Sequence, residues 1–191
     1  MKILLKGEVL RDSGRTDMNE DNLILVNIFD EQVGTMGKEA AHREGRLHRA
    51  FSVFLYHGNR MLIQRRALHK YHSGGLWANS CCSHPRDGEE LTEAVRRRLV
   101  QELGVSCECR ELFSFVYRHQ FHEALYEYEY DHVFIGEYDG SFELNPEEAM
   151  DAAWIGLDEL AQDLTYHPEW YCVWFQTAAP KVIRHIKNNR S

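Results

Sequence analysis

The sequence has no excess of positive charge. Lys and Arg number 22 against 30 Asp and Glu, and the formal net charge is −8 at pH 7. Nucleic acids and anionic membranes are bound by basic surfaces, so a general affinity for either is not expected. An anionic small ligand remains compatible with this charge, because a few clustered cations can bind a phosphate within an acidic protein.

The sequence also lacks a segment that would direct it into a membrane or out of the cell. No apolar run approaches the ~20 residues that span a bilayer. The opening stretch MKILLKGEVL is interrupted by Lys6 and Glu8, too early for a secretory signal. The five cysteines are odd in number and are not spaced like a disulfide framework. We therefore expect reduced thiols and a cytoplasmic location.

Repeats, linkers and low-complexity tracts are missing too, which indicates one domain. A chain of 191 residues can bury one full core and is short for two. Alternating apolar residues predict strands at 22–29, at 47–66 around a turn at 57–60, and near 111–118 and 124–138. We expect a single α+β domain over residues 1–191, with its core at about 22–160 and a C-terminal helical segment at about 168–188.

The clearest predicted helix covers residues 91–103. Asp87 and Glu90 resemble a capping box at its start, and Gly104 is a natural end. Further helix signals occur at residues 146–148 and from Asp158 onward, on either side of a predicted strand.

An acidic side chain lies on the apolar face of the 91–103 helix. At 100° per residue, Glu102 falls within the stripe that starts at Leu91, and Arg98 lies at its edge. A buried carboxylate is costly unless it is paired or bound to a metal. Glu102 is therefore either half of a structural ion pair with Arg98 or a metal ligand.

The stretch YEYEYD, residues 126–131, places acids and tyrosines on opposite faces of a strand. Glu127, Glu129 and Asp131 share the face that continues as Val133 and Ile135, which points inward. Neighbouring carboxylates on a buried face need a proton or a cation between them. A solvated acidic face is the alternative.

Histidines and cysteines add further candidates. His42, His48 and His84, if brought beside two carboxylates, would form a set suited to zinc, manganese or magnesium, whereas each alone is typical of a structural histidine. In NSCCSHP, residues 79–85, the cysteine pair is compatible with several chemistries. These are a zinc corner with Cys107 and Cys109, a strained vicinal disulfide, a nucleophile beside a histidine, and two buried thiols.

Four stretches in order, AAHREGRLHRAFSVF, GLWANSCCSHP, AVRRRLVQELGV and YEYEYDHVF, resemble the type I isopentenyl-diphosphate Δ-isomerases. This family is an offshoot of the Nudix fold, and the resemblance runs from about residue 23 to 159. It implies a Nudix-like α/β/α sandwich with a mixed central sheet.

The resemblance to the Nudix hydrolase box is incomplete. Aligned on Gly104 and Val105, the chain keeps the box residues Glu89, Arg97, Leu99 and Glu102, but Ser83, Arg98 and Gln101 replace a glycine and two glutamates. Because hydrolysis by this fold depends on carboxylates that hold metals and activate water, the departure favours isomerase over hydrolase.

Three groups of residues match functional positions of the isomerase family. The resemblance implies catalytic roles for Cys82, Glu129 and Tyr117. It implies one zinc, manganese or magnesium ion at His42, His48, His84, Glu127 and Glu129, and a magnesium ion that enters with the substrate diphosphate near Glu102. It implies substrate binding by Lys38, Arg66, Lys70, Arg98 and Trp77, and by a C-terminal tryptophan, for which Trp174 fits better than Trp170.

The implied reaction moves a double bond in isopentenyl diphosphate to give dimethylallyl diphosphate, through protonation to a tertiary carbocation and loss of another proton. Cys81 is expected to tolerate replacement by alanine or valine. Two other functions remain open: a Nudix diphosphohydrolase, and a zinc-stabilised binding module in which Cys82 is a structural ligand. The sequence does not predict the oligomeric state.

Overall fold

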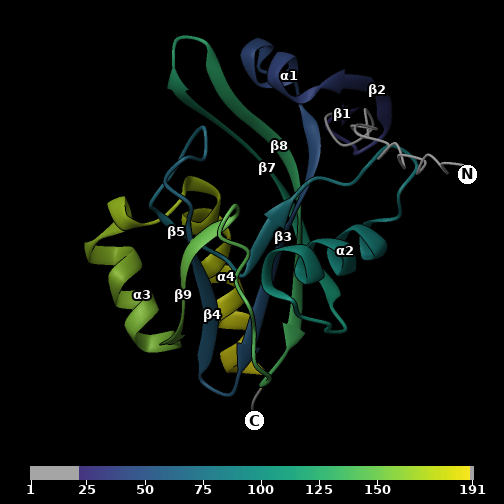
Figure 1. Ribbon diagram of the computed structural model, residues 1–191. Helices are drawn as coiled ribbons and strands as arrows, with labels where there is room; N and C mark the ends of the chain where they lie inside the picture. The colour runs from purple at the N-terminus through teal and green to yellow at the C-terminus, as the bar shows by residue number, and fades with distance from the viewer. Residues whose placement is uncertain (1–21, 190–191) are drawn as a thin grey trace, which may run out of the picture.

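The computed structural model describes residues 22–189, so the MKILLKGEVL stretch lies outside the described part. These residues form one nine-stranded sheet, four α-helices and a short 3₁₀ turn (Figure 1). The strands are β1 (Asn22–Val26), β2 (Gln32–Gly37), β3 (His48–His57), β4 (Arg60–Arg66), β5 (Trp77–Ala78), β6 (Cys81–Ser83), β7 (Arg110–His122), β8 (Leu125–Glu137) and β9 (Ala149–Gly156). The helices are α1 (Lys38–Glu44), α2 (Leu91–Leu103), α3 (Leu157–Tyr166) and α4 (Val173–Asn188), with the 3₁₀ turn at Pro168–Trp170.

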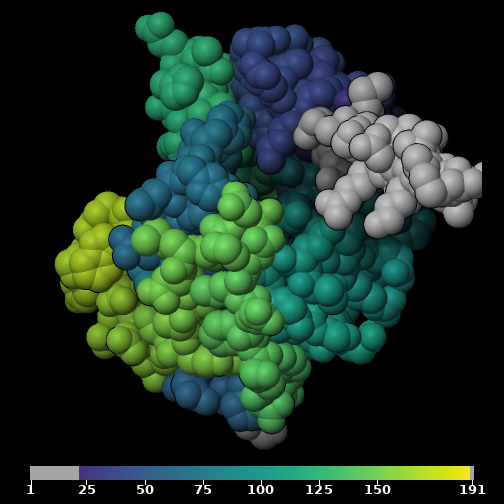
Figure 2. All heavy atoms as spheres, viewed as in Figure 1, coloured from purple at the N-terminus to yellow at the C-terminus, as the bar shows by residue number. Residues whose placement is uncertain are grey.

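The sheet is mixed, as predicted. Its main path runs β2-β1-β3-β4-β5, with β6 and β8 paired to β3, β7 to β8 and β9 to β4. The pairing of β3 with β8 is parallel, whereas the other strand pairs are antiparallel. The long β7–β8 hairpin extends past the sheet, and its tip stands beside α1 at one end of the molecule (Figures 1 and 2).

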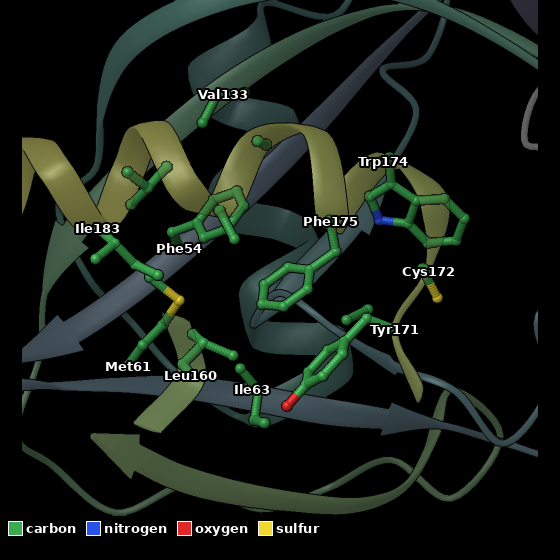
Figure 3. Close-up of a cluster of buried hydrophobic side chains, with 14 of the residues drawn as sticks. Phe54, Met61, Ile63, Val133, Leu160, Tyr171, Cys172, Trp174, Phe175 and Ile183 are labelled. Atoms are coloured by element: carbon green, nitrogen blue, oxygen red, sulfur yellow. The ribbon is translucent and has the colours of Figure 1, made fainter. Parts of the chain in front are cut away.

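Helices cover both faces of the sheet because its central strands are apolar on both sides. Phe51 and Val53 of β3 pack with α2, whereas Phe54, on the opposite face of the strand, packs with α4. The rings of Phe54 and Phe175 stack with centroids 5.7 Å apart (Figure 3). With α3 on the α4 side, these two cores form the predicted α/β/α sandwich.

The predicted start of α2 is only partly correct. Glu90 is the N-cap residue but makes no side-chain capping bond, and Asp87 accepts a hydrogen bond from Gln32 instead. The capping box is therefore wrong. Gly104 ends the helix in the left-handed conformation at φ 63°, as predicted, because glycine adopts this conformation without a Cβ penalty.

Other predicted boundaries also shift. Residues 146–148 form a turn rather than a helix and lead directly into β9. The predicted strand at 22–29 ends at Val26, because the side chain of Asn27 accepts hydrogen bonds from two backbone amides of the following turn. The C-terminal helical segment is interrupted at Tyr171 and Cys172, where the Cys172 amide donates to the carbonyl of Trp77.

All five cysteines are free thiols, in agreement with the expectation of reduced cysteines. Within residues 22–189, no helix combines the length and the apolar character that a membrane span requires.

Candidate active site

A cavity of about 270 Å³ opens between the sheet and the segments that follow β4 and β6. Its walls combine a thiol, carboxylates, imidazoles, several cations and one indole. The residues that line it include Lys38, Arg66, Lys70, His72, Cys82, His84, Arg98, Tyr117, Glu127, Glu129, Glu148 and Trp174.

Strand register assembles the centre of this site. Glu129 on β8 lies opposite His48 on the parallel strand β3 and opposite Tyr117 on the antiparallel strand β7. Ser83 of β6 pairs with Phe51 of β3, which brings the next residue, His84, to the same region. Three neighbouring strands thus surround one carboxylate with side chains that are far apart in sequence.

The predicted histidines and glutamates meet. His42 Nε2 lies 3.1 Å from Glu127 Oε1, and His84 Nε2 lies 3.0 Å from Glu129 Oε1. His48 Nε2 is 3.6 Å from Glu129 Oε1, beyond hydrogen-bond distance. The Tyr117 hydroxyl donates a 2.6 Å hydrogen bond to Glu129 Oε2.

The set has the features of a metal site. His42 Nδ1 lies 2.6 Å from the Lys38 carbonyl and His48 Nδ1 lies 2.9 Å from the Arg46 carbonyl. A carbonyl oxygen only accepts, so both Nδ1 atoms carry a proton, and Nε2 is the atom of each ring that faces the carboxylates and that a cation could bind in place of a proton. His48 Nε2 and Glu127 Oε2 are buried without a hydrogen-bond partner. A divalent metal would satisfy both atoms, so the residues present fit such an ion.

The three acids on β8 differ in protonation. Burial opposes ionisation of Glu129, but the imidazoles of His48 and His84 outweigh it and hold its pKa well below the usual range. Burial and repulsion from Glu129 instead raise the pKa of Asp131 well above its usual range. Burial and repulsion from Glu129 oppose ionisation of Glu127 as well, but hydrogen bonds with His42 and His72 outweigh them and lower its pKa. The shifts thus favour the neutral acid at Asp131 and the ionised form at the other two positions, an arrangement that favours cation binding.

His84 is suited to bind metal at neutral pH. Burial lowers the pKa of its imidazole to about 4, against the opposing effect of Glu129. Its ring is therefore neutral at pH 7, and neutral imidazole is the form that coordinates metals.

Cys82 faces the cavity from β6 and receives a contact from Arg66, whose Nη1 lies 3.7 Å from the sulfur. Burial raises the pKa of the Cys82 thiol, and the nearby Arg66 charge only partly offsets this effect. The thiol therefore stays protonated at neutral pH. Its neighbour Cys81 points to the other face, packs in the α2 core and donates to Glu102 over 3.3 Å.

Four predicted diphosphate-binding cations, Lys38, Arg66, Lys70 and Arg98, all line the cavity. Glu148 holds two of them, with Oε2 2.5 Å from Lys70 Nζ and Oε1 2.9 Å from Arg98 Nη2. A diphosphate is the kind of ligand that a cluster of Lys and Arg on one wall would bind.

Glu102 is buried and already fully paired. Arg98 Nη2 donates to its Oε1 over 2.7 Å, and Gln64 donates to its Oε2 over 3.1 Å. The structural ion pair that the helix periodicity allowed is therefore present. Glu102 is not among the residues that line the cavity.

Replacing Arg98 by methionine should destabilise the fold by about 3 kcal/mol, because breaking a buried pair leaves the Glu102 charge uncompensated. Chemical denaturation measures this loss. The double variant Arg98→Met/Glu102→Gln should recover most of it. Equal stability of the single and double variants would contradict the buried pair.

The structure separates the three candidate tryptophans. Trp174 at the start of α4 is 4% exposed, lines the cavity, and donates from Nε1 to Asn79 Oδ1 over 3.1 Å (Figure 3). Trp170 is 47% exposed and stacks on His167 outside the cavity. Trp77 packs in the core beside α4 and is not among the cavity-lining residues.

Three residues of the site carried no predicted role. Asn79 belongs to the NSCCSHP stretch and orients Trp174 by accepting its indole hydrogen bond. Glu148 binds Lys70 and Arg98 from the turn at residues 146–148, where the sequence indicated a helix. His72 lies 2.6 Å from Glu127 Oε1 and comes from a glycine-containing loop. No periodic pattern in this loop indicates the direction of the His72 side chain.

The fold and the domain comparison agree on the class of protein. The NUDIX domain family matches residues 46–176. A solved protein from Deinococcus radiodurans superposes with a TM-score of 0.70 at 25% identity, covering 84% of this chain and 98% of that one. The MutT protein of Methanosarcina mazei, at 16% identity, shares the fold with a TM-score of 0.58 over 76% of this chain and 96% of its own. The chain is a Nudix-domain protein.

Curated relatives narrow the class. Isopentenyl-diphosphate Delta-isomerase 2 of Aromatoleum aromaticum is 52% identical over 86% of this chain and 87% of its own. The isopentenyl-diphosphate Delta-isomerase of Serratia proteamaculans is 43% identical over 83% of this chain and 89% of its own. The chain therefore belongs to the isopentenyl-diphosphate Delta-isomerase family, which agrees with the resemblance seen in the sequence.

Proposed function

We propose that this protein isomerises isopentenyl diphosphate to dimethylallyl diphosphate. The observation that carries the proposal is one cavity that holds a protonated thiol, Cys82, and a carboxylate, Glu129, beside a wall of cations. Two relatives, 52% and 46% identical to this chain, carry the name of this activity.

The reaction needs two acid–base groups and a shielded cation. The terminal carbon of the alkene gains a proton to give a tertiary carbocation. The CH₂ group on the diphosphate side of the cationic carbon then loses a proton. We assign these proton transfers to Cys82 and Glu129, whose roles exchange with the direction of reaction. Tyr117 donates to Glu129 Oε2 and would hold that carboxyl group toward the alkene.

Trp174 would stabilise the carbocation. Its indole forms part of the buried cavity wall, and an indole face attracts a desolvated cation by roughly 2 kcal/mol without acting as a nucleophile. Asn79 fixes the ring through the hydrogen bond to Nε1. Trp77 does not line the cavity, so we propose that it supports the site only by packing in the core beside α4.

Family membership implies a divalent metal, and the His/Glu set fits one. His42, His48, His84, Glu127 and Glu129 would hold a zinc, manganese or magnesium ion, which would supply positive charge that tunes the acidity of Glu129. A magnesium ion that enters with the diphosphate would have to compete with Arg98 for Glu102, because both carboxylate oxygens already have protein donors. Lys38, Arg66, Lys70 and Arg98 would bind the diphosphate itself.

Hydrolysis is less well supported. The Nudix-box carboxylates that remain are paired with arginines of the same segment: Arg97 grips Glu89 with two hydrogen bonds of 2.7 and 2.8 Å, and Arg98 holds Glu102. Carboxylates held in this way are poorly placed to gather metals around a water nucleophile.

Incubation of metal-replete protein with isopentenyl diphosphate in deuterated water tests the proposal. We expect dimethylallyl diphosphate that carries deuterium in a methyl group, detected by NMR and mass spectrometry. Release of phosphate without an allylic isomer would establish hydrolysis instead. Neither product nor deuterium exchange would contradict the assigned isomerisation.

A further inference from the structure

The strongest feature that the proposed mechanism leaves unused is His72. It lies in the loop of residues 67–76, between β4 and β5, and this loop reaches toward the β7–β8 hairpin (Figure 1). Its side chain is 8% exposed, and Nε2 lies 2.6 Å from Glu127 Oε1, closer than the 3.1 Å of His42 to the same oxygen. A fourth imidazole therefore joins the His/Glu set.

The hydrogen-bond partners of His72 differ from those of the other histidines. His42 and His48 each have a backbone carbonyl at Nδ1, which places a proton on that atom and turns Nε2 toward the carboxylates. The Nδ1 atom of His72 has only the Ser73 hydroxyl, at 3.4 Å. A hydroxyl can donate as well as accept, so His72 is free to carry its proton on Nε2 and donate it to the carboxylate.

The surroundings fix the His72 ring in this place. It stacks on Phe121 of the hairpin, with centroids 4.8 Å apart, and meets Trp174 edge-on at 5.9 Å. The loop backbone is equally constrained, because a Cβ atom on Gly74 would lie 2.5 Å from the Leu68 carbonyl oxygen. The contact with Glu127 is therefore built into the packing of three separate segments.

We propose that His72 is a positioning residue that donates to Glu127 Oε1 and thereby aims Glu127 Oε2 at the metal. Oε2 is buried and has no hydrogen-bond partner, and Glu127, Glu129 and His48 offer ligand atoms within 4.8 Å of one another. Holding one carboxylate oxygen leaves the other to coordinate, which is how partners outside the coordination sphere orient ligands. His72 also makes an edge contact with Trp174, the indole proposed to stabilise the carbocation, so it lies between the proposed metal site and that ring. The proposal rests on the metal use proposed above.

Metal affinity measures this role directly. The apparent dissociation constants of zinc and cobalt are determined by competition with a chromogenic chelator for the wild type, His72→Leu and His72→Gln. We expect His72→Leu to bind about 10–100-fold more weakly. His72→Gln should bind within a few-fold of the wild type, because its amide NH₂ reaches the position of Nε2 and donates. His69→Leu is the matched control, since His69 lies in the same loop, is 60% exposed and pairs with Glu147 instead.

The outcomes separate the positioning role from the alternatives. Wild-type affinity in His72→Leu, with a folded circular-dichroism spectrum, would overturn the proposal. Equal weakening in the leucine and glutamine variants, with a changed visible spectrum of bound cobalt, would make His72 a ligand and would also overturn it. A wild-type chain that binds no divalent metal would remove the proposed metal site itself.

Discussion

Replacing Cys82 by alanine is expected to slow isomerisation by about 10²–10⁴-fold, the usual contribution of a general acid–base group. The thiol lines the cavity, stays protonated because burial raises its pKa, and contacts Arg66. Alanine removes the thiol proton that Cys82 presents to the cavity from β6. Initial rates of dimethylallyl diphosphate formation measure the loss, and metal content and thermal unfolding should change little.

Cys81→Ala is the matched control. This neighbour has no access to the cavity, since its side chain packs in the α2 core and its thiol contacts Glu102. We expect nearly full activity and a loss of about 1 kcal/mol in the free energy of unfolding, as for a small core truncation. If Cys82→Ala instead unfolded the protein and released metal while Cys81→Ala did not, Cys82 would be a structural zinc ligand and the catalytic assignment would be wrong.

Replacing Glu129 by glutamine should both weaken metal binding and slow isomerisation. Glu129 contacts His48, His84 and Tyr117, and its carboxyl group is held ionised by the two imidazoles. The amide of glutamine keeps the shape of the side chain but has no charge and cannot take up and release a proton as the carboxyl group does. We expect a rate loss of more than about 10²-fold, together with greatly weakened metal binding by chelator competition.

Asp131→Asn is the control for this variant. Asp131 lies on the same face of β8, but burial and repulsion from Glu129 raise its pKa well above the usual range and favour the neutral acid, for which an amide is a close replacement. The Ser52 hydroxyl, 2.8 Å from Asp131 Oδ2, can accept from the new amide as readily as it donates to the acid. Metal affinity and rate should therefore stay within a few-fold of the wild type. Equal losses in both variants would show that the effect comes from strand packing rather than from a ligand.

Sequence periodicity predicted which face of a strand or helix each site residue occupies, but not which distant residues come into contact. Alternation along YEYEYD correctly placed Glu127 and Glu129 on a buried face, and the helical wheel correctly buried Glu102 beside Arg98. The meeting of His42, His48 and His84 with those glutamates could not follow from spacing. It depends on the parallel register of β3 and β8, which only the folded sheet determines.

The predictions that failed depended on local signals that tertiary contacts overrode. Asp87 had the position of a capping residue, but Gln32 from β2 takes its carboxylate. The helix signal at residues 146–148 gave way to a turn in which Glu148 binds Lys70 and Arg98. His72 escaped notice because a loop with two glycines has no period that shows where a side chain points.

The parallel pairing of β3 with β8 also has a consequence for how the chain folds. His42 and Glu127 are 85 positions apart, and the proposed metal ligands meet only after the chain between these strands has been closed into a loop. Closing such a loop lowers the entropy of the chain before the contacts that stabilise the loop can form. Topologies rich in distant contacts therefore fold slowly. An ion that binds the assembled ligands stabilises the closed state alone. Metal supply during synthesis would then govern the yield of folded protein as well as its activity.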